Sequence, residues 1–286
     1  MKRIARVFPR KTNATPDDEL SFIGTGPPLL AMPEIDEAHL SVAFSWDLPM
    51  AERLAEEWLS AGVPVKLGGP ALNEPGGDFV PGMYLQKGFT ITSRGCPNRC
   101  AHCAVPAREG FQLRELPIVP GWNIVDDNLL ACSDQHIHAV FDMLAAQKRR
   151  PEFTGGLEAK LLRGWHVEKL QAVKARRMYF AYDTPDDYEP LVIAGKMLIE
   201  AGFKVKNHTM ACYVLIGYDG DTFEKAEKRL YDTIRAGFYP YAMLFRDETN
   251  TTTLEWRKFQ REWLLPKIVG TKIRKMTDIR SPVNVS

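Results

Sequence analysis

The sequence has no long apolar run, little net charge and few cysteines. No stretch approaches the roughly 20 apolar residues of a membrane-spanning helix, and the basic start of the chain lacks the apolar core of a signal peptide. The formal net charge of +1 argues against a protein built chiefly to coat nucleic acid, although it does not exclude local basic patches. These absences predict a cytoplasmic protein with no membrane partner.

The five cysteines are an odd number in a chain of 286 residues. A disulfide framework is typical of small secreted domains with paired cysteines, so it is disfavoured here, and a reducing compartment suits exposed thiols. Apolar residues make up 45% of the chain and charged residues 26%, which is the composition of a folded globular protein. The length favours one large α/β domain with an appendage.

Three of the cysteines, Cys96, Cys100 and Cys103, lie together directly after a strand-like run at residues 88–92. Three thiolates can hold three irons of a four-iron cluster and leave the fourth iron open, whereas a cluster used only for electron transfer normally has four protein ligands. A structural zinc site would need a fourth ligand, and the nearest spare cysteine, Cys132, has no paired partner. The spacing therefore favours an iron–sulfur cluster with one open iron.

From residue 88 onward, strand-like runs recur about every 30 residues, which is the length of a βα unit. They lie near residues 89–92, 123–125, 152–154, 178–182, 213–216 and 241–245. Between most of these runs the apolar residues change to a helical period, and Asp221 to Glu224 has the pattern of a capping box that opens a helix. Six parallel strands with outer helices predict a partial (βα)6 barrel of the TIM-like type.

The cysteine spacing after a first strand, together with the run Gly217-Tyr218-Asp219-Gly220-Asp221-Thr222 after the fifth, resembles the radical S-adenosylmethionine (SAM) superfamily. The resemblance implies a 4Fe-4S cluster on the three cysteines, with the amino and carboxylate groups of SAM on the open iron. It also implies an electron donor such as flavodoxin or ferredoxin, cleavage of SAM, and a 5′-deoxyadenosyl radical that abstracts hydrogen from a substrate. His102 departs from the family's usual aromatic residue before the third cysteine, but its backbone could face the adenine.

Polar residues and glycines follow the predicted strands, and in such barrels the chemistry lies at the carboxyl ends of strands. The resemblance implies that SAM contacts residues after the second to fifth strands: Asp126, Asp127, Asn128, Gly155, Gly156, Glu158, Lys160, Tyr182, Asp183, Gly217 and Tyr218. A carboxylate after the second strand could accept hydrogen bonds from the SAM ammonium, and the alternative is an Asp that caps a helix. Glu158 and Lys160 have the opposite charges that suit an amino acid zwitterion.

The N-terminal part predicts a small structural appendage. Residues 1–38 are rich in proline, glycine and acidic residues and predict an irregular, ordered lead-in. A strand at 39–46, a helix that begins at Asp47 and ends at Gly62, and a strand at 63–67 follow. This β-α-β piece resembles a remnant of a cobalamin-binding domain, but it lacks a His-centred motif, so cobalamin is not expected. A structural cap is the other interpretation.

The C-terminal part carries the predicted substrate side. Arg246 follows the last strand and is predicted to be a catalytic residue that faces the substrate cavity. Residues 256–263 interleave basic and aromatic side chains, so this helix is expected to form one wall of the cavity, or alternatively to pack against the barrel exterior. Cys132 and Cys212 are expected to be small buried hydrophobic residues.

The predicted domains are residues 1–87, 88–246 and 247–286. The substrate stays open between a nucleobase, possible within a nucleic acid, and an amino-acid-like group. The alternative function is a non-catalytic iron–sulfur electron carrier or redox sensor, which would explain the cysteines but not the motifs at the successive strand ends.

Overall fold

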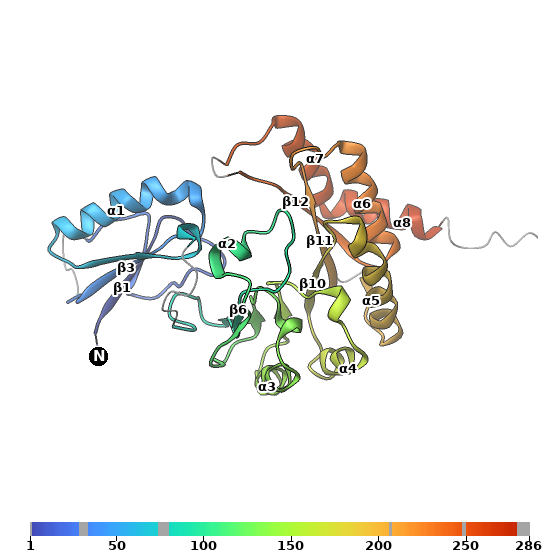
Figure 1. Ribbon diagram of the computed structural model, residues 1–286, viewed down its shortest axis with the longest axis horizontal. Helices are drawn as coiled ribbons and strands as arrows, with labels where there is room; N and C mark the ends of the chain where they lie inside the picture. Colours follow the sequence, from blue (N-terminus) through green and yellow to red (C-terminus); the bar gives the residue numbers. More distant parts are fainter. Residues whose placement is uncertain (1, 29–33, 74–79, 206–207, 248–249, 279–286) are drawn as a thin grey trace, which may run out of the picture. The chain divides into compact units, whose positions relative to one another are not determined.

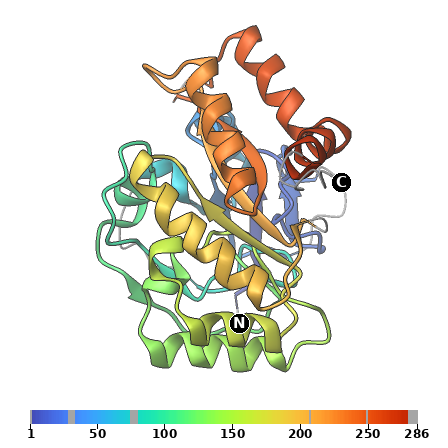
Figure 2. The same cartoon turned by 90° about the vertical axis from the view of Figure 1, so that its right-hand side faces the viewer.

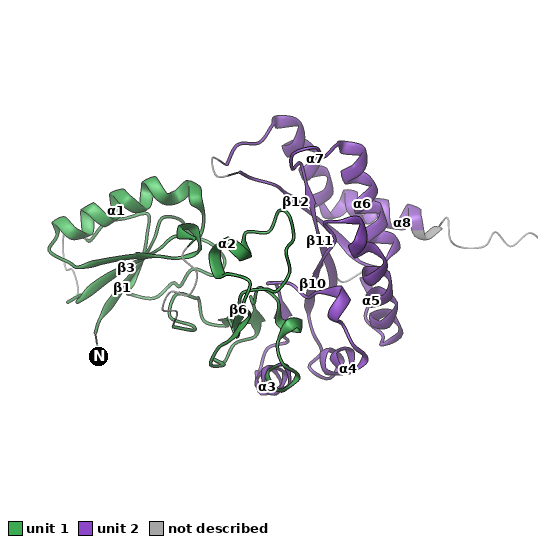
Figure 3. Ribbon diagram, in the orientation of Figure 1, with its two compact units in different colours: residues 1–136 green, residues 137–286 purple. Residues whose placement is uncertain are grey.

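The computed structural model describes residues 2–28, 34–73, 80–205, 208–247 and 250–278; of residues 277 and 278 it describes the backbone only. The chain divides into two compact units, residues 1–136 and 137–286 (Figure 3). Both are α/β units with parallel strands, and no sheet formed by the described residues closes into a barrel. No helix within these ranges is both long and apolar enough to cross a membrane.

Unit 1 begins with a four-stranded parallel sheet (Figure 1). Its strands are β1 (Ile4–Phe8), β2 (Ser21–Ile23), β3 (Glu37–Ser41) and β4 (Val65–Gly68), in the order β2-β1-β3-β4. The prediction of an irregular lead-in over residues 1–38 is therefore wrong, because β1 and β2 lie inside it. Both strands are short and owe their structure to pairing with a neighbour far along the chain, which a local pattern does not reveal.

Helix α1 (Leu48–Ser60) covers one face of this sheet. Its Leu54 and Trp58 are completely buried and pack in one cluster with apolar residues of the strands, among them Val7 and Leu40. The predicted end at Gly62 is confirmed, since this glycine has φ 81° and follows the last turn. The preceding strand is shorter than predicted, because β3 ends at Ser41 and the 3₁₀ helix η1 (Ser45–Asp47) follows. The Asp47 carboxylate does not cap α1 and instead accepts hydrogen bonds from the Arg10 guanidinium.

The opposite face of the sheet is polar and centres on Glu37. Its carboxylate bonds to the Lys2 ammonium, and it lies 3.1 Å from both His39 Nε2 and Lys66 Nζ. The hydrogen bond from Lys2, then those from His39 and Lys66, lower the pKa of Glu37 from its ordinary value of 4.5 to about 2. The carboxylate is therefore ionised at neutral pH.

The low pKa of Glu37 makes stability depend on pH in acid. Because this pKa is lower in the folded chain than in the unfolded one, the contribution is complete above pH 4.5 and is lost as the pH falls through about 2. We expect Glu37→Gln to flatten the loss of stability over this interval, measured as urea midpoints at successive pH values. A variant whose midpoints fall as steeply as those of the parent chain would contradict this prediction.

The rest of unit 1 contains short elements around the cysteines. Strands β5 (Phe89–Thr90) and β8 (Asn123–Ile124) pair in parallel, and β6 (Ser93–Arg94) and β7 (Arg114–Glu115) pair antiparallel. The 3₁₀ helices η2 (Pro70–Leu72) and η3 (Leu129–Ala131) and the short helix α2 (Val105–Glu109) complete it, and α3 (Asp134–Ala145) begins here and continues into unit 2. The first two predicted strands from residue 88 are thus confirmed as β5 and β8.

Unit 2 holds four parallel strands in the order β12-β11-β10-β9. These are β9 (Glu152–Phe153), β10 (Arg177–Ala181), β11 (Met210–Ile216) and β12 (Tyr239–Leu244). The helices are α4 (Gly164–Ala172), α5 (Tyr188–Glu200), α6 (Phe223–Arg235), α7 (Leu254–Leu264) and α8 (Pro266–Asp278), with 3₁₀ helices η4 (Ala159–Leu161) and η5 (Pro185–Asp187). All four remaining strand predictions are confirmed, each within three residues.

The helices of unit 2 bury the faces that their periodicity predicts. On α6 the buried apolar residues are Ala226, Leu230 and Ile234, and Thr222 caps the helix by accepting a hydrogen bond from the Lys225 amide. Helices α5 and α6 lie beside the strands (Figure 2), and the strand residues on the buried face include Cys212, with no exposed surface. Cys132 of unit 1 is also buried, and burial raises its pKa to about 12, so both are buried hydrophobic residues as predicted.

Candidate functional site

The predicted cluster cysteines lie on a loop that leaves and rejoins the β6–β7 hairpin. The hairpin pairs Arg94 with Arg114, and the Leu116 amide donates to the Thr92 carbonyl at 2.8 Å, so both ends of the 95–113 loop are held together. Gly95 opens the loop with φ 85°, and an added Cβ would lie 2.3 Å from the Gln112 carbonyl oxygen. Only glycine fits this position, because both the conformation and the close contact exclude a side chain.

None of the three loop cysteines is in a disulfide. Cys96 is buried, Cys100 and Cys103 are exposed, and the Cys103 amide donates to the Cys100 carbonyl at 3.1 Å to form a turn. Across the described part of the chain, no group of three His, Cys, Asp or Glu side chains is gathered as a metal would require. The structure thus places the three thiols on one loop, and the binding of one iron–sulfur cluster by all three stays a prediction.

Asp126, predicted to contact SAM, is buried and faces the strand segment before the cysteines. Its carboxylate accepts hydrogen bonds from the Thr92 amide at 2.6 Å, the Thr92 hydroxyl at 2.5 Å and the Ser93 hydroxyl at 2.9 Å. Burial raises the pKa of Asp126, and these hydrogen bonds act in the opposite direction. The carboxylate therefore ties the segment that leads into the cysteine loop to the end of β8.

The next two residues bind the cysteine loop itself. Asp127 accepts hydrogen bonds at 3.0 Å from the Gly95 amide and from the Arg108 guanidinium, and the Asn128 side-chain amide donates to the sulfur of Cys96 at 3.4 Å. Asn128 occupies the N-cap position of η3, but its side chain makes no capping hydrogen bond, and neither Asp126 nor Asp127 is at that position, so the alternative of a helix-capping Asp is wrong for η3. The parallel pairing of Thr90 with Ile124 brings residue 126 level with residue 92, and this register is the signal from which the contact could have been inferred.

A network of charged side chains that the sequence analysis missed supports the loop. Arg94 lies 3.7 Å from Glu109 and 3.8 Å from Asp127, and Arg114 lies 2.8 Å from Glu109. These side chains come from both hairpin strands, from α2 and from the segment after β8. Because opposite charges alternate within the network, it fixes the end of α2 to the hairpin around the loop.

In unit 2 the predicted residues after β9 adopt an irregular turn. Gly156 has φ 123°, and an added Cβ would meet no atom within 4 Å, so the backbone conformation alone requires glycine there. Gly155 precedes it and Glu158 stands before η4. The Lys160 ammonium lies 2.9 Å from the Asp187 carboxylate, which raises the pKa of Lys160. Lys160 is thus joined to the segment after β10.

After β10, the Tyr182 side chain is buried, whereas the Asp183 side chain bonds to the backbone of β11. Tyr182 is buried, its ring lies 5.7 Å from that of Tyr188, and burial raises its pKa to about 12. The Asp183 carboxylate accepts a hydrogen bond from the Leu215 amide at 2.9 Å, next to the carboxyl end of β11. Asp183 therefore lies at a strand end as predicted, whereas the Tyr182 ring lies in the packed interior.

The motif after β11 is built around two interactions. Gly217 has φ 73°, and an added Cβ would lie 2.8 Å from Leu244 and 3.0 Å from the Trp256 ring. The Gly217 amide donates to Asp221 at 2.8 Å, and Arg229 of α6 donates at 2.8 Å to the same carboxylate and lies 5.3 Å from the Tyr218 ring. The buried Asp221–Arg229 ion pair, which the sequence analysis missed, holds the motif on α6.

The predicted substrate residues lie after β12 and on α7, in the C-terminal part of unit 2. Arg246 is exposed and donates to the Asn250 side chain at 2.5 Å, while Glu248 beside it lies outside the described residues. On α7, Trp256 packs against Gly217 and Phe223, and Trp263 is buried with its ring 5.2 Å from that of Tyr231. The buried end of α7 therefore packs against α6, which is the structural alternative for this helix.

Each unit groups part of the predicted set by itself. Unit 1 brings Asp126, Asp127 and Asn128 to the cysteine loop, and unit 2 brings Lys160 and Asp183 to the segments around Asp187 and β11. No protein-family model matches this chain, and a search of the curated proteins finds no match either.

Proposed function

We propose that this chain is a radical SAM enzyme that carries a 4Fe-4S cluster on Cys96, Cys100 and Cys103. The observation that supports the proposal best is the loop with three thiols, which Asp126, Asp127 and Asn128 tie to the carboxyl end of β8. A loop held in this way presents ligands from one rigid element, as a functional site requires. The six strands at the predicted positions support a partial (βα)6 barrel as part of the same proposal.

The donor chemistry of the loop suits an iron–sulfur cluster. Thiolates are the usual ligands of such clusters, and the N–H group that Asn128 directs at the sulfur of Cys96 is the kind of contact that tunes them. When bound, the cluster and SAM would supply reductive cleavage of SAM and a 5′-deoxyadenosyl radical that removes hydrogen from the substrate. The protein would supply binding, orientation and exclusion of water.

The SAM-binding roles are part of this proposal. Asp127 and Asn128 hold the loop, and His102 offers its backbone to adenine. Lys160 pairs with Asp187. Glu158 is assigned to the SAM ammonium by its negative charge and its place after β9, and Asp183 is a further acceptor beside β11. The other assigned residues are Gly155, Gly156, Tyr182, Gly217 and Tyr218. Arg246 belongs to the substrate side, and the electron donor would be a flavodoxin or ferredoxin.

The test is anaerobic reconstitution with iron and sulfide, followed by reduction in the presence of SAM. Formation of 5′-deoxyadenosine is the expected result, since the proposed reaction cleaves SAM reductively and releases this group. An intact reduced cluster that yields no 5′-deoxyadenosine would contradict the proposal and favour the electron carrier or redox sensor.

Two conservative variants separate SAM binding from loop support. We expect Glu158→Gln to keep the full iron content and to bind SAM about tenfold more weakly, because a charged hydrogen bond is lost. Asp127→Asn should lower the iron content as well, because the acceptor of the Gly95 and Arg108 hydrogen bonds loses its charge. Iron analysis and equilibrium dialysis with labelled SAM measure both quantities.

The matched control is Asp142→Asn on α3, whose carboxylate is largely exposed and pairs with Lys169 at 3.5 Å. It should change neither the iron content nor the SAM affinity. If Glu158→Gln bound SAM as the parent chain does, Glu158 would have a structural role only.

A further inference from the structure

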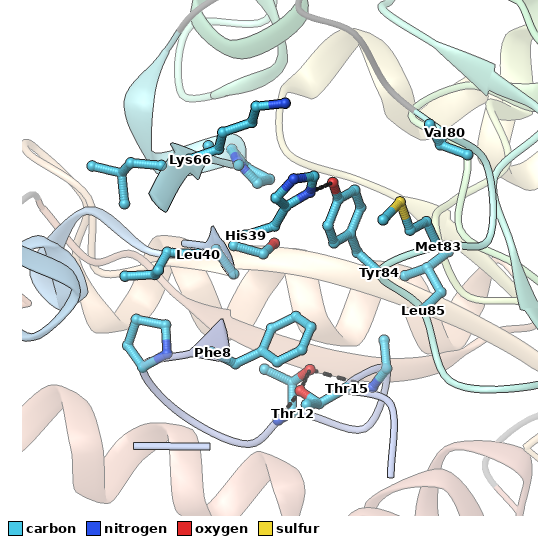
Figure 4. A pocket seen from close by; sticks show the side chains of 18 of the residues that line it. Phe8, Thr12, Thr15, His39, Leu40, Lys66, Val80, Met83, Tyr84 and Leu85 are labelled. Carbon is cyan, nitrogen blue, oxygen red and sulfur yellow. Dashed lines mark hydrogen bonds between the residues drawn. The ribbon is translucent and has the colours of Figure 1, made fainter. Parts of the chain in front are cut away.

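Unit 1 contains a cavity of about 770 Å³ that the proposed function does not use. It lies on the face of the N-terminal sheet opposite α1, and the segments at residues 8–15 and 80–85 form its other walls (Figure 4). Parallel sheets normally have packed layers on both faces, so an open polar face is unusual. The volume is within the range of about 300–1,000 Å³ typical of small-molecule sites.

The cavity includes the place where ligands bind in open parallel sheets. In the order β2-β1-β3-β4, the strand that follows β1 in the chain, β2, lies on one side of β1, and the next strand, β3, lies on its other side. The direction in which strands are added therefore reverses between β1 and β3. The residues at the carboxyl ends of these strands, Phe8 to Arg10 and Ser41, line the cavity, as does Gly68 at the end of β4. Ligands bind preferentially at such a reversal, outside the carboxyl ends of the strands.

Three side chains form a hydrogen-bonded chain along the cavity wall. The Tyr84 hydroxyl lies 2.7 Å from His39 Nδ1 (Figure 4). On the other side of the ring, His39 Nε2 lies 3.1 Å from the Glu37 carboxylate. Because the ionised Glu37 only accepts hydrogen bonds, Nε2 carries the ring hydrogen, and in the neutral ring Nδ1 accepts a hydrogen bond from the Tyr84 hydroxyl. A hydroxyl, an imidazole and a carboxylate in this order are the arrangement by which proteins transfer a proton from a hydroxyl.

The charged groups around this chain favour an anion. His39 faces Glu37 on its own strand, Arg6 on the neighbouring β1 and Lys66 on β4, with Tyr84 opposite. The lining contains more bases than acids: Lys2, Arg10, Lys66, Arg94 and Arg108 against Glu37, Asp47 and Glu109. Lys2 and Lys66 share the single carboxylate of Glu37, and Arg10 pairs with Asp47, so the excess of bases remains after these ion pairs are formed. Apolar side chains, among them Phe8, Met83 and Leu85, form the remaining wall. An apolar body with one acidic group is complementary to these surroundings, and an aromatic ring is such a body.

We propose that this cavity binds a small aromatic acid and that Tyr84, His39 and Glu37 take up its acidic proton. The ligand's O–H bond breaks and its proton forms a new O–H bond on Tyr84. The original phenolic proton of Tyr84 moves to Nδ1 of His39, and the resulting imidazolium faces the Glu37 carboxylate. The ligand is left as an anion among the basic side chains. No electrons are transferred, so no oxidant or reductant is needed.

The probe for this site is 4-nitrophenol, an aromatic acid whose phenol and phenolate forms differ in visible absorption. We expect the full-length chain to bind it at one site and to raise the ratio of bound phenolate to phenol about tenfold over that of the free probe at the same pH. Tyr84→Phe and His39→Asn should retain binding but lose this change in ratio. Lys66→Met should weaken binding about threefold, as expected for a partly exposed charge.

Gly68 allows the cavity to be blocked. An added Cβ at Gly68 meets no atom within 4 Å, and this position lies on the cavity face beside Ser41, so Gly68→Phe should fill the cavity and abolish binding. If Gly68→Phe does not fold, Ser41→Leu on the same face replaces it. Tyr188→Phe on α5 and Lys196→Met, an exposed lysine of the same helix, are the controls and should leave binding and ratio unchanged.

Three results would overturn the proposal. The first is that the parent chain binds no 4-nitrophenol. The second is that the folded blocking variant binds it as tightly as the parent chain. The third is that the ratio of bound phenolate to phenol is the same in Tyr84→Phe as in the parent chain. The readouts need neither iron nor SAM, so they are independent of the proposed enzyme activity.

Discussion

Replacing Cys96, Cys100 or Cys103 by alanine, one at a time, is expected to remove nearly all bound iron and sulfide after anaerobic reconstitution. An open-iron cluster has only three protein ligands, so the loss of one leaves too few to hold it. The loop itself should keep its structure, because its anchors are Asp126 and Asp127 rather than the thiols. Iron and sulfide analysis together with circular dichroism measures both effects.

The matched control for these variants is Cys132→Ala. Cys132 is a buried thiol of the same unit, outside the loop, and its replacement should leave the iron content unchanged. A loop variant that retained the full cluster content of the parent chain would show that its cysteine is not a ligand. Retention in all three would remove the main support for the proposed function.

Replacing Arg229 by methionine is expected to lower the free energy of unfolding by about 3–5 kcal/mol, because it leaves the buried Asp221 carboxylate without its partner. The Arg229 and Asp221 side chains are only 10% and 0% exposed, and the guanidinium also donates to the Leu215 carbonyl. Urea denaturation measures the loss. The motif at Gly217 should loosen with it, since Asp221 also accepts from the Gly217 amide.

The adjacent residue on the same helix provides the control. Lys228 pairs with Asp232, but its side chain is 74% exposed, so Lys228→Met should change stability by less than about 1 kcal/mol. The double variant Asp221→Asn with Arg229→Met should recover part of the stability, because no buried charge remains. Equal losses in Arg229→Met and Lys228→Met would show that the buried pair does not hold the motif.

The positions of the strands and helices from residue 88 onward follow from local patterns. Alternation along β10 to β12 and the helical periods of α3, α5 and α6 depend only on which residues are apolar and how they are spaced, so they could be predicted. The start of α6 was predicted to within one residue, since the capping box was placed at Asp221 to Glu224 and the N-cap is Thr222. The helix end at Gly237 depends in the same way on neighbours a few positions away. The cysteine spacing is likewise a local property.

The sequence alone therefore determined the α/β class, most element positions and the residues that could carry a cluster. Only the tertiary structure decided that β1 and β2 form a sheet, that Asp126 holds Thr92 across 34 positions of the chain, that Lys160 pairs with Asp187, and that Asp221 pairs with Arg229. The tertiary structure also decided that Tyr84 and His39, which are 45 positions apart, meet at the wall of one cavity. Hydrogen bonds and ion pairs act over a few ångströms in space, and a local pattern does not report which distant residues folding brings within that range.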